Sequence, residues 1–212
     1  ATLEQGSDAC DYEKPIHSVT LSDYYIGETE VTQKLWEVVM GNNPSKYKND
    51  QNPVECVSWY DCQEFIKKLN VITGENFRLP TESEWEYAAR GGCLSEGYKY
   101  AGSDIVDEVA WHRYNSEKRQ HSEVKGLNPN ELGLYDMSGN VCEWCQDCFL
   151  PYNYLRDEAS INNEMKDDNY KYTIYQDQIF FVHGNDFDKK NGDLISSYAR
   201  VLRGGCWDYL ST

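Results

Sequence analysis

Three segments between residues 32 and 92 carry the apolar spacing of short amphipathic helices. The first begins after Thr32, a residue type that favours the N-cap position, and it ends at Gly41, which suits the left-handed turn after a helix. A stripe of this kind buries itself against another element of the fold. We expect one face of this helix to carry Leu35, Trp36, Val39 and Met40.

The second predicted helix starts at Ser58, where Asp61 completes a capping-box pattern, and it stops before Gly74. Its apolar residues recur at helical spacing and define one buried stripe. Cys62 falls on that stripe, so we interpret it as a core residue and not as a chemical group. The other members of the stripe are Phe65, Ile66 and Leu69.

The third predicted helix follows Thr81, which we assign as its N-cap, and Glu84 occupies the third helical position of a capping box. Paired glycines, Gly91 and Gly92, end the segment. The residues expected to face inward are Trp85, Ala88 and Ala89. All three helices therefore have start and stop signals as well as a periodic face.

Outside these helices the pattern is short and irregular. Residues 17–25 alternate well enough to predict a strand, and residues 170–182 suggest a hairpin turning at Gln176 and Asp177. From residue 93 onward no helical period survives, and short runs alternate with Gly, Asn and Asp turns. We predict an α+β fold with short antiparallel strands and much irregular loop. One domain covers residues 1–212, with a divergent insertion at about 151–200.

The composition of the chain limits the classes of partner that it can bind. The chain has 212 residues and a formal net charge of −16, so nucleic acid would be repelled over most of the surface. Cations and basic peptides remain open, and we expect a protein or peptide ligand. No apolar run approaches the roughly 18 residues of a membrane span, and no signal-peptide pattern is present. We expect an extracytoplasmic protein, either secreted or in a bacterial envelope.

Residues 133–148 admit two chemistries. Cys142, Cys145 and Cys148 have the C-x2-C-x2-C spacing of an iron–sulfur loop, but Tyr152 replaces the fourth cysteine of that pattern. Three readings of this cluster stay open: a zinc site completed by another ligand, a disulfide, or buried thiols. The overlapping turn Ser138-Gly-Asn-Val-Cys-Glu143 instead presents oxygen ligands.

Several phrases together resemble the formylglycine-generating-enzyme family, also called sulfatase-modifying-factor domains. They are YYIGETEVTQKLW at 24–36, MGNNPS at 40–45, PVECVSW at 53–59, FRLPTESEWEYAARGG at 77–92, NELGLYDMSGNVCEW at 130–144 and RVLRGGCW at 200–207. They occur in the family's order. The resemblance implies a modified C-type-lectin-like fold. The chain lacks the phrases that usually form the first and last strands of family members, so we expect a chain truncated at both ends.

The resemblance also implies a calcium ion in the turn at residues 138–143. Matching positions would supply the main-chain carbonyls of Ser138, Gly139 and Val141 and the carboxylate of Glu143. Such a set suits Ca²⁺, which takes six to eight hard oxygen ligands. The alternative is that Asn140 and Glu143 only tie the turn by hydrogen bonds.

Active members of that family resemble copper oxidases, in which two cysteine thiolates hold Cu(I) and a substrate cysteine becomes formylglycine. Tyr209 stands where the first of these cysteines is expected, and the second would fall beyond Thr212. Copper would therefore bind only if a missing C-terminal part supplied two cysteines. Family members usually have Trp at positions 142 and 148 and Ser at 206. Cys206 is a poor substitute for the copper ligand.

These observations favour a calcium-stabilised, non-catalytic binding or display module. The alternatives are a copper-dependent oxidase whose catalytic cysteines lie in a missing part, and a decayed copy of such an enzyme. The histidines form no metal-ligand pair in sequence, and we leave them unassigned: His17, His112, His121 and His183.

Overall fold

The computed structural model describes residues 18–116, 120–148 and 200–208, without the side chain of Cys148. By its internal contacts the chain divides into two units, Ala1–Asp23 with Asp147–Val201, and Tyr24–Gln146 with Leu202–Thr212. Nearly all described residues belong to the second unit. The predicted insertion at about 151–200 and the hairpin at 170–182 lie outside the described residues, apart from Arg200. The single-domain assignment therefore stays a prediction.

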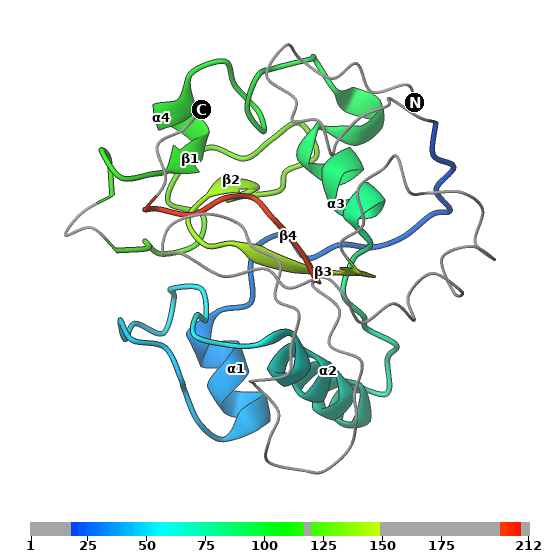
Figure 1. Ribbon diagram of the computed structural model, residues 1–212, viewed down its shortest axis with the longest axis vertical. Helices are drawn as coiled ribbons and strands as arrows, with labels where there is room; N and C mark the ends of the chain where they lie inside the picture. Colours follow the sequence, from blue (N-terminus) through cyan, green and yellow to red (C-terminus); the bar gives the residue numbers. More distant parts are fainter. Residues whose placement is uncertain (1–17, 117–119, 149–199, 209–212) are drawn as a thin grey trace, which may run out of the picture. The chain divides into compact units, whose positions relative to one another are not determined.

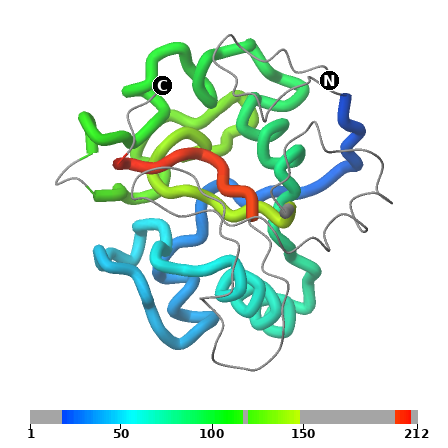
Figure 2. Tube along the Cα trace, viewed as in Figure 1, coloured from blue at the N-terminus to red at the C-terminus, as the bar shows by residue number. Residues whose placement is uncertain are grey.

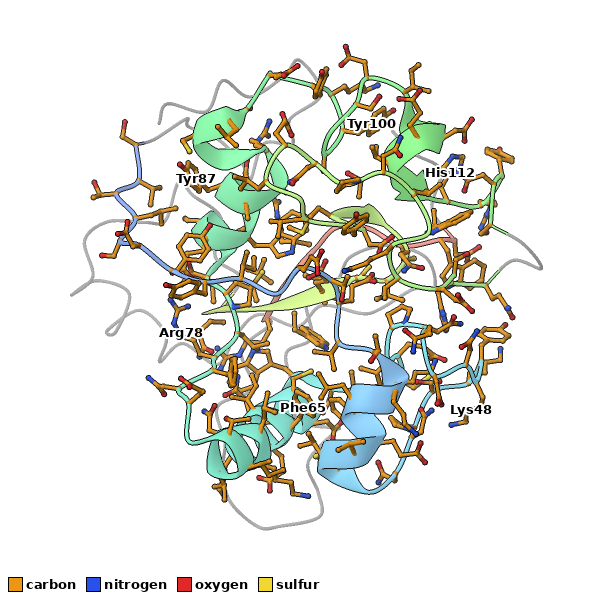
Figure 3. The ribbon with its side chains drawn as sticks, turned by 180° about the vertical axis from the view of Figure 1, so that it is seen from behind. Lys48, Phe65, Arg78, Tyr87, Tyr100 and His112 are labelled. Atoms are coloured by element: carbon orange, nitrogen blue, oxygen red, sulfur yellow. The ribbon has the colours of Figure 1, made fainter. Side chains whose placement is uncertain are left out.

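Helices α1 (Gln33–Met40) and α2 (Trp59–Thr73) pack against each other and bury one aromatic pair (Figure 1). The Trp36 and Phe65 rings stack with centroids 4.9 Å apart, and both side chains are buried. Figure 3 shows Phe65 on α2 pointing toward α1. The predicted caps are confirmed: Thr32 and Ser58 begin the helices, and glycines in left-handed conformation end them.

The predicted face of α1 was partly wrong. Leu35 is exposed, and the buried residues of this helix are Gln33 and Trp36. Gln33 is 0% exposed because its amide holds the following loop: Nε2 donates to Tyr47 O at 2.8 Å and Pro53 O at 3.2 Å. Its Oε1 accepts from Asn43 Nδ2 and from the Asn49 backbone N–H. The helix therefore buries a polar residue, Gln33, beside Trp36, whereas Leu35 is exposed although apolar spacing placed it on the buried face.

Helix α3 (Glu82–Ala89) follows the predicted capping box of Thr81 and Glu84. The Glu84 carboxylate also accepts two bonds from the Arg78 guanidinium, at 2.6 and 2.7 Å. The inward residues are confirmed as buried: Trp85, Ala88 and Ala89. After Gly91, whose φ is +80°, the chain forms a short 3-10 helix, η2 (Gly92–Leu94).

Two departures concern the predicted strands. The described part of residues 17–25 forms no strand, because its exposure does not alternate and it carries no strand pairing. Strands β1 (Ala110–Trp111) and β2 (Ser138–Gly139) pair in parallel, not antiparallel. The 26 residues between them are long enough for the crossover that parallel pairing requires. Strands β3 (Glu143–Cys148) and β4 (Arg200–Arg203) form the other described pair.

A single-turn helix, α4 (Val106–Val109), leads directly into β1. It is too short to leave a period in the sequence, so the expectation of no helix after residue 93 was wrong at this point. Among the described residues no helix combines the length and apolar character needed to cross a bilayer.

Candidate functional site

The turn that leaves β2 is built on two consecutive left-handed residues. Gly139 has φ +87° and Asn140 has φ +56°. A Cβ on Gly139 would lie 2.3 Å from Trp111 O, which is a backbone atom and cannot yield. Glycine is therefore required here, and asparagine is among the few other residues that tolerate the following left-handed position.

Asn140 is completely buried and uses both ends of its amide. Oδ1 accepts from the Ser122 N–H at 2.9 Å, and Nδ2 donates to Glu30 Oε2 at 3.0 Å and to Ser122 O at 3.3 Å. The other oxygen of Glu30 accepts from the Val141 N–H at 3.3 Å. Asn140 therefore does tie this turn by hydrogen bonds, with Glu30 as an unforeseen partner, and the choice between this interpretation and a calcium site is untested.

Three carboxyl groups lie around this turn: those of Glu30 and Asp136 are buried, and that of Glu143 is partly buried. Burial, followed by the nearby charges of Asp136 and Glu143, raises the pKa of Glu30 well above its ordinary value. Burial also raises the pKa of Asp136, although its carboxylate accepts a hydrogen bond from the Lys125 N–H. For Glu143, burial raises the pKa to about 7, while the Trp85 indole lowers it and Asp136 raises it further. Negative charge is thus costly at this point of the fold.

Glycine at position 204 leaves a small space that oxygen atoms face. A Cβ placed there would lie 3.4 Å from a ring carbon of Trp85, 3.7 Å from Glu143 Oε1 and 3.7 Å from Val141 O. Two of the four predicted calcium ligands therefore face one small volume, and both are hard oxygens that suit the ion. Ser138 and Gly139 belong to the same turn, where the Ser138 hydroxyl accepts from the Ala101 N–H at 3.2 Å. The donor set fits calcium, and the assignment stays a prediction.

The segment after β4 lies along this turn. Gly139 N–H donates to Gly204 O at 2.7 Å, and Trp207 N–H donates to Asn140 O at 2.9 Å. Figure 2 shows the red C-terminal segment passing beside the yellow-green segment that carries the turn. Two main-chain bonds thus fix residues 204–207 against residues 139–140.

A cavity of about 250 Å³ lies next to the turn. Its lining includes two cysteines that are distant in sequence, Cys142 and Cys206. Their thiols are hydrogen-bonded to each other, which raises the pKa of Cys142 well above its ordinary value. Sequence reasoning missed this pair, although both positions depart from the family pattern. The remaining lining residues are Val54, Glu55, Cys56, Val57, Val141, Trp144 and Trp207.

Of the sequence cluster, the side chains of Cys142 and Cys145 are described, and they differ in exposure, since Cys142 is partly buried and Cys145 is fully buried. Cys145 is 0% exposed, and its carbonyl accepts from Trp59 Nε1 at 3.0 Å. Neither Cys142 nor Cys145 forms a disulfide. Within the described ranges no three His, Cys, Asp or Glu side chains are placed to hold a metal together. The part of the cluster prediction that involves the Cys148 side chain is untested.

Two histidines take structural roles. His121 is buried and its Nδ1 lies 3.0 Å from Asn52 Nδ2; burial lowers its pKa, against the opposing charge of Glu55. His112 is buried beside Asp107, with Nε2 2.8 Å from Oδ1. Figure 3 shows His112 close to the end of α4. His17, His183 and Tyr209 lie outside the described residues.

Comparison with known proteins agrees with the sequence phrases. The Paenibacillus barcinonensis protein named "Chaperone protein LppX" is 40% identical over 60% of this chain. The Streptomyces coelicolor "Formylglycine-generating enzyme" is 36% identical over 49% of this chain. The alignments span 63% and 34% of these two relatives, so in each case less than two thirds of the relative is matched.

A solved structure, "Treponema denticola variable protein 1", superposes with a TM-score of 0.69 at 29% identity. It covers 97% of this chain and 80% of that chain. The predicted mixed fold of helices, small strands and irregular loops is confirmed by this similarity. The profile of the Sulfatase-modifying factor enzyme 1-like domain matches residues 2–211. Its extent leaves no large segment outside the match, and the chain belongs to the family of Sulfatase-modifying factor enzyme 1-like domains.

Proposed function

We propose that this chain is a non-catalytic binding module whose turn at residues 138–143 is stabilised by calcium. The observation that carries the non-catalytic part is Tyr209, which stands where active relatives have a copper-binding cysteine. A phenol does not replace a soft thiolate as a ligand for Cu(I).

The partner that suits this chain is a basic protein or peptide. A net charge of −16 attracts cationic segments and repels anionic ones. Exposed tyrosines supply large contact area at low conformational cost. Tyr114 is 77% exposed, and the neighbouring Arg113 is anchored by an ion pair with Asp208 at 2.9 Å. This anchoring makes Tyr114 the best-supported contact residue, because a rigid platform loses less entropy on binding.

Calcium would be held by the carbonyls of Ser138, Gly139 and Val141 and by the Glu143 carboxylate. The ion would supply positive charge among the buried carboxyl groups, where the raised pKa values of Glu30, Asp136 and Glu143 mark a cost for negative charge. The residues of the chain supply the rest of the rigidity through the Asn140 and Glu30 hydrogen bonds.

The catalytic alternative is tested with the full chain, Cu(I), dioxygen and a cysteine-containing sulfatase peptide, analysed by mass spectrometry. We expect the peptide cysteine to remain unchanged, while an active formylglycine-generating enzyme converts it under the same conditions. Conversion by this chain would overturn the proposal in favour of a copper-dependent oxidase.

Binding is tested by titrating the immobilised chain with a Lys- and Arg-rich peptide and with an acidic peptide of equal length. The basic peptide should bind, and its affinity should fall as salt is raised. Tyr114→Ala should weaken binding ~10-fold, as expected for an interface anchor. Tyr25→Ala is the matched control, because Tyr25 is exposed as well, and within the described ranges no ion pair anchors the residues next to it. Equal loss in both variants would contradict the assigned surface.

The calcium assignment is tested by thermal unfolding after chelation, with Ca²⁺ or Mg²⁺ added back. We expect Ca²⁺ alone to stabilise the chain, by about 2.7 kcal/mol at a concentration 100 times the Kd. Glu143→Gln should remove the effect. Glu28→Gln is the matched control, since Glu28 pairs with Lys125 on the surface. If Ca²⁺ does not raise the melting temperature of the wild-type chain, the calcium assignment is wrong and Glu143 has a structural role only.

A further inference from the structure

Two cysteines 64 positions apart in sequence meet in the cavity beside the turn. Cys142 and Cys206 both line it, and their thiols are hydrogen-bonded to each other without forming a disulfide. Each stands where the family resemblance places another residue type, Trp at 142 and Ser at 206. Two separate departures from the family pattern thus converge on one contact.

Main-chain bonds hold the two cysteine-bearing segments in place. Trp207 N–H donates to Asn140 O, and Gly139 N–H donates to Gly204 O. These bonds lie next to Cys206 on one strand of chain and close to Cys142 on the other. The contact between the thiols is therefore fixed by the backbone, and little rearrangement is needed to bring two such sulfur atoms to bonding distance.

The cavity gives a small reagent access to this pair. It measures about 250 Å³, and both cysteines are only partly buried. An exposed third thiol, Cys56, also lines it. Cys145, by contrast, is 0% exposed. Reagents that enter the cavity thus reach Cys142 and Cys206 but not the nearest cysteine in the sequence cluster.

We infer that Cys142 and Cys206 form a redox-modification site that closes into a disulfide by exchange with a small-molecule disulfide. One cysteine thiolate attacks a sulfur of the reagent, whose S–S bond breaks and releases one thiol. The second cysteine then attacks the resulting mixed disulfide, forms the Cys142–Cys206 bond and releases the second thiol. Two electrons pass to the reagent, and the two cysteine protons end on the released thiols.

Formation of the Cys142–Cys206 disulfide links the turn covalently to the segment after β4. The bond adds to the two main-chain hydrogen bonds that already join these segments and constrains the unfolded chain across a long loop. This site is separate from the proposed binding function, because it requires neither calcium nor a peptide partner.

The experiment incubates the full chain under native conditions with hydroxyethyl disulfide, quenches with N-ethylmaleimide in denaturant, and counts the remaining thiols by mass spectrometry. We expect Cys142 and Cys206 both to lose their thiols in a cross-linked peptide pair, whereas the exposed Cys56 and Cys93 should carry only mixed disulfides with the reagent. Reduction should restore both thiols. The oxidised chain should melt about 5–15 °C higher than the reduced chain.

Cys142→Ser and Cys206→Ser should each abolish the cross-link and the rise in melting temperature. Cys93→Ser is the matched control, because Cys93 is exposed and does not line the cavity. Cross-links from Cys142 to Cys145, Cys148 or Cys56 would overturn the inference, as would stable mixed disulfides on Cys142 and Cys206 without a bond between the two. Full retention of both thiols would overturn it equally, and this readout on the wild-type chain does not depend on how the variants fold.

Discussion

The two sides of residues 139–142 differ in how completely they are occupied. On one side, Asn140 is 0% exposed and its amide bonds Ser122 and Glu30 at both ends. On the other side, Cys142 lines a cavity of about 250 Å³. In a fully hydrogen-bonded polar network, the loss of one side chain leaves its buried partners unsatisfied. A cavity wall with spare volume can instead accommodate side chains of different size. This contrast explains how one short segment can retain a family phrase and depart from it within three positions.

The largest expected effect comes from breaking the polar side. Asn140→Ala leaves the buried Glu30 carboxylate without its amide donor and Ser122 without both bonds, so we expect a loss of about 3–5 kcal/mol in unfolding free energy. Chemical denaturation measures it. Asn49→Ala is the matched control, because its amide also bonds a carboxylate, that of Glu123, but at an exposed position. We expect that control to lose less than about 1 kcal/mol.

Filling the cavity on the other side should raise the free energy of unfolding. Cys142→Trp places a large ring beside the cavity, and recovery of about 20–25 cal/mol per Å³ filled predicts a gain of about 1–2 kcal/mol. Cys145→Trp is the contrasting variant, since Cys145 is fully buried and does not line the cavity, and overpacking should cost it about 1–3 kcal/mol or more. Equal destabilisation of both variants in denaturant melts would refute the idea that the wall has room.

A smaller effect concerns how folding stability changes as pH falls, because the carboxyl group of α3 and those around the turn respond in opposite directions. The Arg78 guanidinium lowers the pKa of Glu84 to about 2, so this pair stabilises the fold above pH 4.5 and the contribution is lost as pH falls toward 2. We expect about 1–2 kcal/mol, because Arg78 is half exposed and the pair is screened. Burial raises the pKa values of Glu30 and Asp136, so their protonation favours the folded state as pH falls.

Glu84→Gln should therefore flatten the acid limb of a stability curve recorded from pH 7 to pH 2. The exposed Glu64→Gln, which carries a surface pair with Lys67, serves as the control and should leave that limb unchanged. If the limb persists in Glu84→Gln, acid unfolding starts at another group.

Sequence reasoning was accurate where the signal is local. The capping boxes at Ser58 and Thr81 and the glycines after α1 and α2 were predicted in place, because each depends on residues within a few positions of one another. These features require no knowledge of distant contacts.

Prediction failed where distant segments decide the outcome. The apolar spacing of α1 pointed to Leu35, but a loop ten to twenty residues away recruits Gln33 to the interior. Spacing grouped Cys142 with Cys145 and Cys148, whereas the segment after β4 brings Cys206 to Cys142. Glu30 lies 110 positions before Asn140, so no local pattern could join them.

The buried Gln33 amide also determines which wall of the cavity can give way. One of its bonds ends on Pro53 O, immediately before Val54 to Val57 of the lining, and the Val54 N–H is held by Val31 O. The Gln33 amide holds that wall in place, and because the amide is uncharged, its hydrogen bonds do not change with oxidants or with pH. The loop behind Gln33 therefore keeps its place, and any strain from joining Cys142 to Cys206 falls on the two main-chain bonds that hold residues 204–207 against residues 139–140.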